Sequence, residues 1–226
     1  MGQPSSSTAT TRADRIWLDV PYAEKDAAKA VGARWDPHAR RWYDPRPATP
    51  ELQQWAARPE LPDLLPGEDR TYKPGLFVDL IPTTSWFTNV RSCVAPRDWD
   101  RVRWMVTRRA GRTCEACGAA ENRAEQRWLE AHERWAYDAK HSVQSLRRLV
   151  CLCTDCHRTT HYGLAEIHGT ADQAFHHLMA VNGLSAAQAK SHISDAVDLW
   201  HARSLREWFL DLTVLTRQGI ELVPPR

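Results

Sequence analysis

The stretch LVCLCTDCHRTTH at residues 149–161 decides how the second part of this chain folds. It holds one Cys-x-x-Cys pair, Cys153 and Cys156, and a matching pair lies upstream at Cys114 and Cys117. Such a turn presents two thiolates to one ion, and two turns complete the tetrahedral coordination of structural Zn²⁺. A redox dithiol is disfavoured, because no thioredoxin-like pattern surrounds either pair. The sequence therefore predicts a structural Zn²⁺ bound by all four cysteines.

Three histidines near this stretch form a second candidate metal site. His157 and His161 are at positions i and i+4 of a helix predicted to begin at the second cysteine pair, so they share one helix face. His132 lies at the end of a predicted strand over 127–133. Histidines converging from a strand and a helix would leave open positions on a divalent ion. Such an ion can bind a phosphodiester oxygen and stabilise charge during hydrolysis.

Further elements are predicted on both sides of the cysteine and histidine region. A helix over 96–110 buries one apolar face and ends at Gly111. A long loop is expected between the strand over 127–133 and the next strand around Cys151. Patterns typical of capped helices and of a late strand complete the chain over 171–181, 186–205 and 208–215.

The N-terminal third reads as a separate small unit. Residues 1–13 are small and polar, which is typical of a disordered tail. An α+β domain is expected over 14–47, with a strand, an Ala-rich helix that ends at Gly32, and a hairpin. We expect at least two of the three tryptophans Trp17, Trp35 and Trp42 to lie in its core. The segment 48–80 is rich in proline and is predicted to be a surface linker.

Composition is compatible with a phosphate-binding site. The 226 residues include 30 Lys and Arg and 28 Asp and Glu, a net charge of +2. This small average conceals an excess of five basic residues over 91–163, the segment with the metal motifs. The planar guanidinium group of Arg can donate two parallel hydrogen bonds to one phosphate. The phosphate-binding candidates are Arg134, Arg147, Arg148 and Arg158.

No transmembrane helix or secretory signal is visible, and we expect a cytoplasmic protein without a membrane partner. Thiols stay reduced in that compartment, which favours metal binding over disulfides.

The N-terminal unit resembles a known small domain. The residues that carry the likeness are Val20-Pro21-Tyr22, Glu24-Lys25, Ala27 to Ala30, Gly32 to Asp36 and Arg41-Trp42-Tyr43. The unit is similar to a domain of unknown function that is appended to bacterial plasmid primases and related DNA enzymes. This resemblance implies a nucleic-acid setting and no particular reaction.

The cysteine and histidine region resembles the HNH nucleases, which have a ββα-metal fold. The likeness rests on Trp99 with its helix, the 112–118 knuckle, the 129–132 strand, the 149–153 strand, and Cys156-His157 with His161. A closer likeness, over roughly 80–221, is to a group of bacterial HNH proteins of undescribed function. The resemblance implies that the four cysteines bind zinc, and that His132, His157 and His161 bind a catalytic divalent ion: Mg²⁺, Mn²⁺, Ni²⁺ or Zn²⁺.

Two positions depart from the HNH pattern. Glu133 stands where the family has its general-base His, and Arg148 stands near the place of the Asn that orients this base. A carboxylate is a weak base at pH 7 unless burial raises its pKa. Glu133 and His141 are therefore both candidate bases. Alternatively His132 is the base, and Glu130 or Glu133 is a ligand.

Together these observations predict an α+β protein. The expected order is a small α+β domain over 14–47, a linker over 48–80, a zinc-stabilised HNH-like module over 81–168, and a helical extension over 169–226. The resemblance implies an HNH-type endonuclease that hydrolyses nucleic acid, with DNA preferred, in bacterial defence or a mobile element. The alternative is a non-catalytic zinc module that binds nucleic acid or protein and has lost the HNH base.

Overall fold

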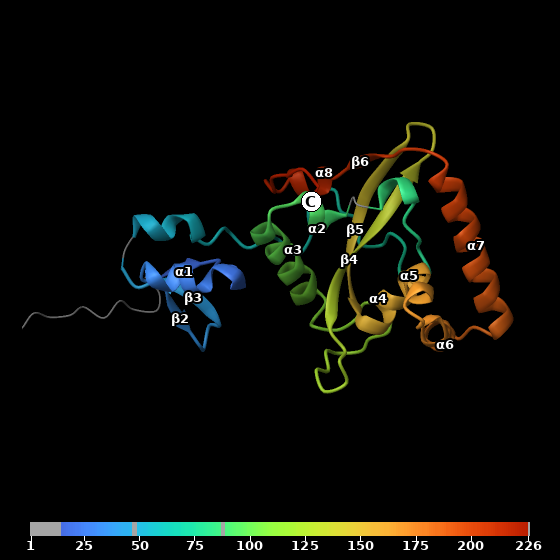
Figure 1. Cartoon of the computed structure of the whole chain (residues 1–226), viewed down its shortest axis with the longest axis horizontal. Coiled ribbons are helices and arrows are strands. Elements are labelled where there is room, and N and C mark those ends of the chain that lie inside the picture. Colours follow the sequence, from blue (N-terminus) through green and yellow to red (C-terminus); the bar gives the residue numbers. More distant parts are fainter. Residues whose placement is uncertain (1–14, 47–48, 87–88, 226) are drawn as a thin grey trace, which may run out of the picture. The chain divides into compact units, whose positions relative to one another are not determined.

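The computed structural model describes residues 15–46, 49–86 and 89–225, so the predicted tail over 1–13 lies outside the described residues. The described residues form two compact units, divided between Glu60 and Leu61 (Figure 1). Both combine helices with a small sheet, which confirms the predicted α+β class. None of the helices in the described ranges is long and apolar enough to cross a bilayer.

The first unit is a three-stranded antiparallel sheet with strand order β1-β3-β2. Its elements are β1 (Ile16–Leu18), the 3-10 turn η2 (Tyr22–Glu24), α1 (Lys25–Ala30), β2 (Arg34–Asp36), β3 (Arg41–Asp44) and the 3-10 helix η3 (Pro50–Trp55). Gly32 follows α1 with φ +107°, a conformation that L side chains rarely adopt, and so lets the chain turn into β2.

Aliphatic residues and one later tryptophan build the core of this unit. Leu18, Ala28, Leu52 and Trp55 are buried together, and Trp42 packs against them partly buried. The prediction that at least two of Trp17, Trp35 and Trp42 lie in this core is wrong, because of the three only Trp42 packs against it. Trp35 is 47% exposed, because it lies on the outer strand β2 and meets only the edge of the Trp42 ring.

The proline-rich segment 48–80 differs from the expected surface linker. Leu52 and Trp55 belong to the core of the first unit, whereas Leu61 and Leu65 lie in a core of the second. Leu76 and Val78 are buried in a further cluster of the second unit. Apolar side chains spaced between the prolines are removed from water by this packing, which a free linker would leave exposed.

The second unit is built around a long antiparallel hairpin (Figure 1). Its elements are η4 (Thr83–Ser85), α2 (Val90–Cys93), α3 (Pro96–Arg109), β4 (Leu129–Asp138), β5 (Val143–Cys153), α4 (Thr154–Thr160), α5 (Tyr162–Ile167), α6 (Ala171–Asn182), α7 (Ala186–Ser204), β6 (Phe209–Asp211) and α8 (Thr213–Thr216). β6 pairs parallel with β5, so the sheet order is β4-β5-β6.

The long loop expected between the two strands is absent from the hairpin. β4 continues to Asp138 and β5 starts at Val143, with a tight turn between them. The carboxylate of Asp138 closes this turn by accepting hydrogen bonds from the backbone N–H groups of Lys140 and His141. Trp135 and Tyr137 extend the alternating pattern of β4 beyond the predicted strand end, since their side chains pack on the core.

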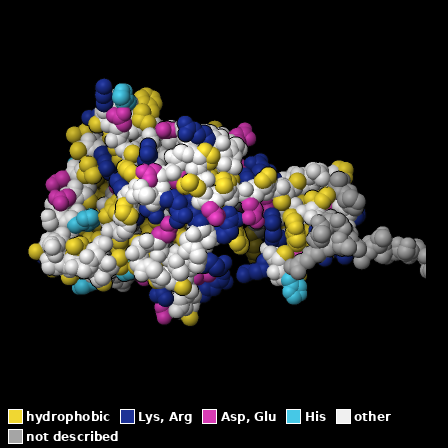
Figure 2. Space-filling model, turned by 180° about the vertical axis from the view of Figure 1, so that it is seen from behind, with side chains coloured by type: hydrophobic (Ala, Val, Ile, Leu, Met, Phe, Trp, Pro, Cys, Tyr) yellow, Lys and Arg dark blue, Asp and Glu magenta, His cyan; other side chains and the backbone are white. Residues whose placement is uncertain are grey.

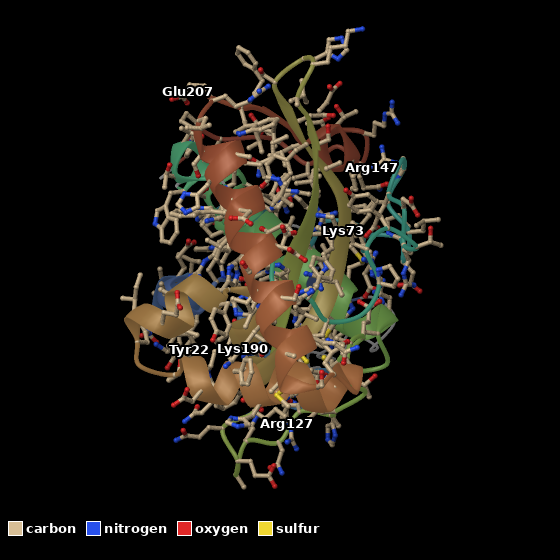
Figure 3. The ribbon with its side chains drawn as sticks, turned by 90° about the vertical axis from the view of Figure 1, so that its right-hand side faces the viewer. Tyr22, Lys73, Arg127, Arg147, Lys190 and Glu207 are labelled. Carbon is tan, nitrogen blue, oxygen red and sulfur yellow. The ribbon has the colours of Figure 1, made fainter. Side chains whose placement is uncertain are left out.

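The two faces of the hairpin contact different helices. On one face, Ala131 and Trp135 share a core with Val102 and Met105 of α3 and with residues of α2 and α8. On the other face, Val150 and Leu152 pack with buried residues of α4, α6 and α7. Figure 3 shows α7 running along this second side of the hairpin. His132 pairs with Val150 and so points to the second face.

The C-terminal elements largely follow the predicted pattern. Both expected helices are present as α6 and α7, and Ser185 forms the expected capping box with Gln188. The late strand is shorter than the predicted 208–215, because Asp211 accepts hydrogen bonds from the backbone N–H and the hydroxyl of Thr213 and so begins α8.

We predict that one buried ion pair attaches the proline-rich segment to the second unit. Glu68 and Arg109 form a pair 2.6 Å apart with side chains 0% and 1% exposed, and Glu68 also accepts from the N–H of Leu149. Glu68→Ala leaves a buried guanidinium unpaired and should lower the free energy of unfolding by about 3–5 kcal/mol. Chemical denaturation of the full chain measures this change.

The matched control is Asp63→Ala, which breaks the exposed pair between Asp63 and Arg108. Its effect should stay below about 1 kcal/mol, because water screens that pair. Equal small effects in the two variants would show that the pair between Glu68 and Arg109 does not stabilise the second unit.

Candidate metal centres

The four predicted zinc cysteines meet at one point. The sulfur atoms of Cys114, Cys117, Cys153 and Cys156 lie within 4.8 Å of one another, and those of Cys117 and Cys153 are 3.6 Å apart. All but Cys117 are buried. This donor set and spacing suit a tetrahedral structural metal ion, for which four thiolates are typical ligands of Zn²⁺.

Local backbone contacts place these sulfur atoms. Cys114 and Cys117 lie in a turn after α3, where Gly118 adopts φ +76° and its N–H donates to the carbonyl of Cys114 at 2.9 Å. Glu115, between the two cysteines, accepts a hydrogen bond from the N–H of Cys151 at 2.7 Å. The first knuckle is thereby joined to β5, which ends at Cys153, while Cys156 lies in the first turn of α4.

The thiols compete for negative charge. Hydrogen bonds from Cys153 and Cys156 hold the pKa of Cys114 far below its ordinary value. The same contacts with Cys114 and Cys153 raise the pKa of Cys156. Among Cys114, Cys153 and Cys156 one anion is therefore favoured, at Cys114, and a divalent cation would stabilise the cluster as thiolates.

The three predicted histidines also come together. Candidate ligand atoms of His132, His157 and His161 lie within 4.8 Å of one another, with ring centroids 4.6 to 5.3 Å apart. His132 comes from β4, His157 from α4, and His161 from the junction where α4 ends and α5 begins. The N–H of His161 donates to the carbonyl of His157, which keeps both rings on one side of the helix.

The environment keeps these imidazoles neutral. Burial lowers the pKa of His132 well below 6.5. Burial also lowers the pKa of His157 and of His161 to about 4, and the positive charge of Arg134 contributes to both shifts. A neutral imidazole has one nitrogen lone pair available, so the cluster suits a metal ion better than three protonated rings would.

The two carboxylates near the histidines lie on opposite faces of β4. Glu133 faces α2, where it accepts a hydrogen bond from the N–H of Val90 at 3.0 Å, and it lies 4.0 Å from Nδ1 of His132. Burial raises the pKa of Glu133 to about 6. Glu130 shares the histidine face, with a carboxylate oxygen 3.5 Å from Nδ1 of His157 and 40% of its side chain exposed. Burial of the rest raises its pKa.

His141 does not belong to the histidine cluster. Its side chain is 62% exposed in the turn of the hairpin, where Nδ1 contacts the carboxylate of Asp138 at 2.5 Å. The prediction that His141 is a base of this site is therefore wrong. A long loop could have returned His141 to the histidine cluster, but the strands are joined by a tight turn at the end far from it.

The four predicted phosphate-binding arginines are dispersed. Arg134 is fully buried, with its guanidinium 4.1 Å from the Phe77 ring and donating to the carbonyl of Gly75. Arg148 is buried on Glu115. Arg158 is partly exposed and pairs with Asp155 on α4.

Arg147 is exposed beside the segment 61–80, as Figure 3 shows, and its guanidinium lies 6.0 Å from the Tyr72 ring. The face of the larger unit in Figure 2 shows basic and acidic side chains interspersed. Arg134 and Arg148 thus interact with partners inside the protein, and the four arginines do not form one basic patch.

A buried charge network lies next to the histidines, and no sequence motif predicted it. Asp79 is 6% exposed and accepts from Lys73 at 3.3 Å and from Arg203 at 3.2 Å. Its negative charge favours protonation of His161, opposing the effect of Arg134. Asp79 lies in the proline-rich segment and Arg203 in α7, and no local motif connects them.

The similarities to known proteins fall within the first unit. Residues 15–56 match the family described as Domain of unknown function (DUF5710). Two Escherichia coli proteins named DNA primase TraC are 44% and 38% identical to this chain over 55 residues, which is 24% of this chain. The match covers only 5% and 4% of those proteins, so the chain spans a small part of the relatives it matches. No solved structure matches the chain significantly.

We predict that Cys156→Ser lowers the bound zinc by about one ion per chain, because a hydroxyl is a poor zinc ligand, and that it destabilises the second unit. Cys151→Ala is the matched control, since Cys151 is buried in β5 and its side chain is not in the four-cysteine cluster. Metal analysis of purified protein measures both. Full zinc retention in Cys156→Ser would contradict the assignment.

The histidines should make stability pH-dependent. Unfolded His157 protonates near its ordinary pKa of 6.5, whereas the folded residue protonates only near 4, so its stabilising effect is present above 6.5 and is lost as the pH falls to 4. The loss amounts to at most about 3 kcal/mol for this residue. His157→Asn should flatten the pH dependence of the free energy of unfolding between pH 7 and 4. An unchanged pH dependence in His157→Asn would contradict this linkage.

Proposed function

We propose that the second unit is a metal-dependent endonuclease of the HNH type that hydrolyses phosphodiester bonds, with DNA as the preferred substrate. The observation that carries this proposal is the convergence of His132, His157 and His161 from a strand and the following helix. The order of hairpin and helix, β4-β5-α4, agrees with the ββα-metal arrangement that the sequence resemblance implies. The adjacent four-cysteine cluster agrees with a zinc knuckle.

In this proposal the three histidines hold a divalent ion: Mg²⁺, Mn²⁺, Ni²⁺ or Zn²⁺. When bound, such an ion supplies Lewis-acid stabilisation of the charge that develops on the phosphate. The chain contributes neutral nitrogen donors, since burial keeps the pKa of His157 and of His161 near 4. Glu130 lies 3.5 Å from Nδ1 of His157 and would favour the tautomer that leaves Nε2 free to bind the ion.

Glu130 is also a better candidate base than Glu133. It shares the histidine face of β4, it is 40% exposed, and burial of its remaining surface raises its pKa. Glu133 has the more strongly raised pKa, about 6, but its carboxylate is engaged by the N–H of Val90 on the other face. We therefore propose that Glu130 accepts the proton of the attacking water. Glu133 is the alternative base, because it stands at the position of the general-base His in the HNH pattern.

Positive charge next to the histidines favours an anionic substrate. Arg134 follows His132 by two positions on the same face of β4, and its Nε and Nη1 atoms have no hydrogen-bond partner among the described residues. Burial lowers its pKa only to about 10, so it remains charged at pH 7. Its buried position implies a long-range attraction of phosphate rather than contact. Arg158, on α4 and partly exposed, is the candidate for direct contact.

The first unit supports the choice of nucleic acid. Its relatives carry the name DNA primase, and we propose that this unit brings a related nucleic-acid context to the chain. The match is confined to one small domain, so it bears on substrate class and not on the reaction.

A second candidate function is a zinc module that binds nucleic acid or protein without cleaving it. The observation in its favour is the engagement of Glu133 by α2, since this removes the residue at the HNH base position from the histidine face. The two functions differ in metal content. The binding module needs only the ion at the four cysteines, whereas the nuclease needs a second ion at the histidines.

We predict that the full chain nicks or linearises supercoiled plasmid in the presence of one of the four divalent ions. His132→Ala and His157→Ala should abolish cleavage, because each removes a metal ligand. Glu130→Gln should slow cleavage by about 10²-fold or more, since an amide cannot accept the proton. Gel assays with plasmid, single-stranded DNA and RNA measure these rates and define the substrate class.

His141→Ala is the control, because the exposed turn is remote from the cluster in the sheet. Undiminished cleavage by His132→Ala would refute the histidine site. Absence of cleavage with every metal, together with one bound zinc per chain, would favour the binding module.

A further inference from the structure

One histidine outside the two predicted sites contacts the cysteine cluster. Nε2 of His177 lies 3.1 Å from the sulfur of Cys156, within hydrogen-bonding distance. His177 belongs to α6, two helices after the knuckle residue that it contacts. Its ring thus adds a nitrogen at the edge of a group of four sulfur atoms.

Packing of α6 fixes the position of this ring. Leu178, the next residue, is fully buried in a cluster with Cys114, Cys153 and Cys156. The carbonyl of Ala174, one turn earlier, accepts a hydrogen bond from the hydroxyl of Thr159 on α4 at 3.3 Å. Because both contacts dock α6 on α4, the backbone that carries His177 has little freedom to move away from Cys156.

The charge of the metal-bound cysteine cluster decides which partner donates the hydrogen bond between His177 and Cys156. Four thiolates and one Zn²⁺ leave two net negative charges, and the sulfur atoms of Cys114, Cys153 and Cys156 are shielded from water. A metal-bound thiolate has no proton to donate, so the histidine must donate from Nε2. Hydrogen bonds to an ionised acceptor are stronger than neutral ones, and partners of metal ligands commonly tune metal affinity.

We infer that His177 is a positioning residue of the structural metal centre: its Nε2–H donates to the Cys156 thiolate and slows release of the ion. The ring does not bind the metal, because the four sulfur atoms already complete a tetrahedral set. The inference concerns only the cysteine cluster, and it holds or fails independently of nuclease activity.

The test uses the full chain loaded with Co²⁺, whose thiolate charge-transfer absorption reports the cysteine site alone. After addition of excess EDTA, this band should decay ten- to a hundredfold faster in His177→Phe than in the wild type, because the ring remains but the donor is lost. His177→Gln retains an N–H donor and should decay at nearly the wild-type rate. His177→Ala provides the same comparison if the larger ring of Phe prevents folding.

His176→Phe is the matched control. It changes the adjacent residue of α6, whose exposed ring contacts the backbone carbonyl of Asp172 instead of the cysteines. Equal decay rates in His176→Phe and in the Phe and Ala variants of His177 would overturn the inference. The inference would also be overturned if the Co²⁺ spectrum of the wild type were typical of three sulfur ligands and one nitrogen ligand and changed in His177→Phe. That result would make His177 a metal ligand.

Discussion

The antiparallel pairing of β4 with β5 is the constraint on which the second unit depends. Because side chains alternate along each strand, this pairing sends Ala131, Glu133 and Trp135 to the core beneath α3 and sends Glu130 and His132 to the side of α4. A slip of one residue would exchange these sets and place a histidine in the apolar core. The register therefore decides at once which residues hold the fold together and which are available for chemistry.

The two candidate metal centres share one short helix. Cys156 and His157 are neighbours in α4, and His161 caps the end of this helix, so the helix that completes the four-cysteine cluster also positions two of the three histidines toward β4. A helix of seven residues is not stable by itself in water. Metal binding at the cysteines would fix its start, and packing of α6 would fix its side. A metal ion at the cysteines would thus support the histidine geometry.

Local patterns predicted much of this arrangement. The Cys-x-x-Cys spacing and the i, i+4 histidines identified both clusters, because each motif fixes its own local geometry. The tight turn at Asp138 and the position of His141 escaped prediction, since strand length depends on packing that a local pattern does not contain. The contact between His177 and Cys156 joins two helices that no motif relates. Sequence reasoning therefore identified the chemical groups better than the neighbours that adjust them.

The basic excess over 91–163 has a different meaning in the folded chain. Much of it is neutralised inside the protein, where Arg109 pairs with Glu68 and Arg148 pairs with Glu115. Arg134 is buried next to the histidines, where burial lowers the pKa of His157 and of His161 and the charge of Arg134 adds to both shifts. A buried cation acts through a medium of lower dielectric constant than water, so its effect extends further than that of an exposed one. The positive charge next to the histidines thus includes a guanidinium that is buried, and it does not come from a basic surface alone.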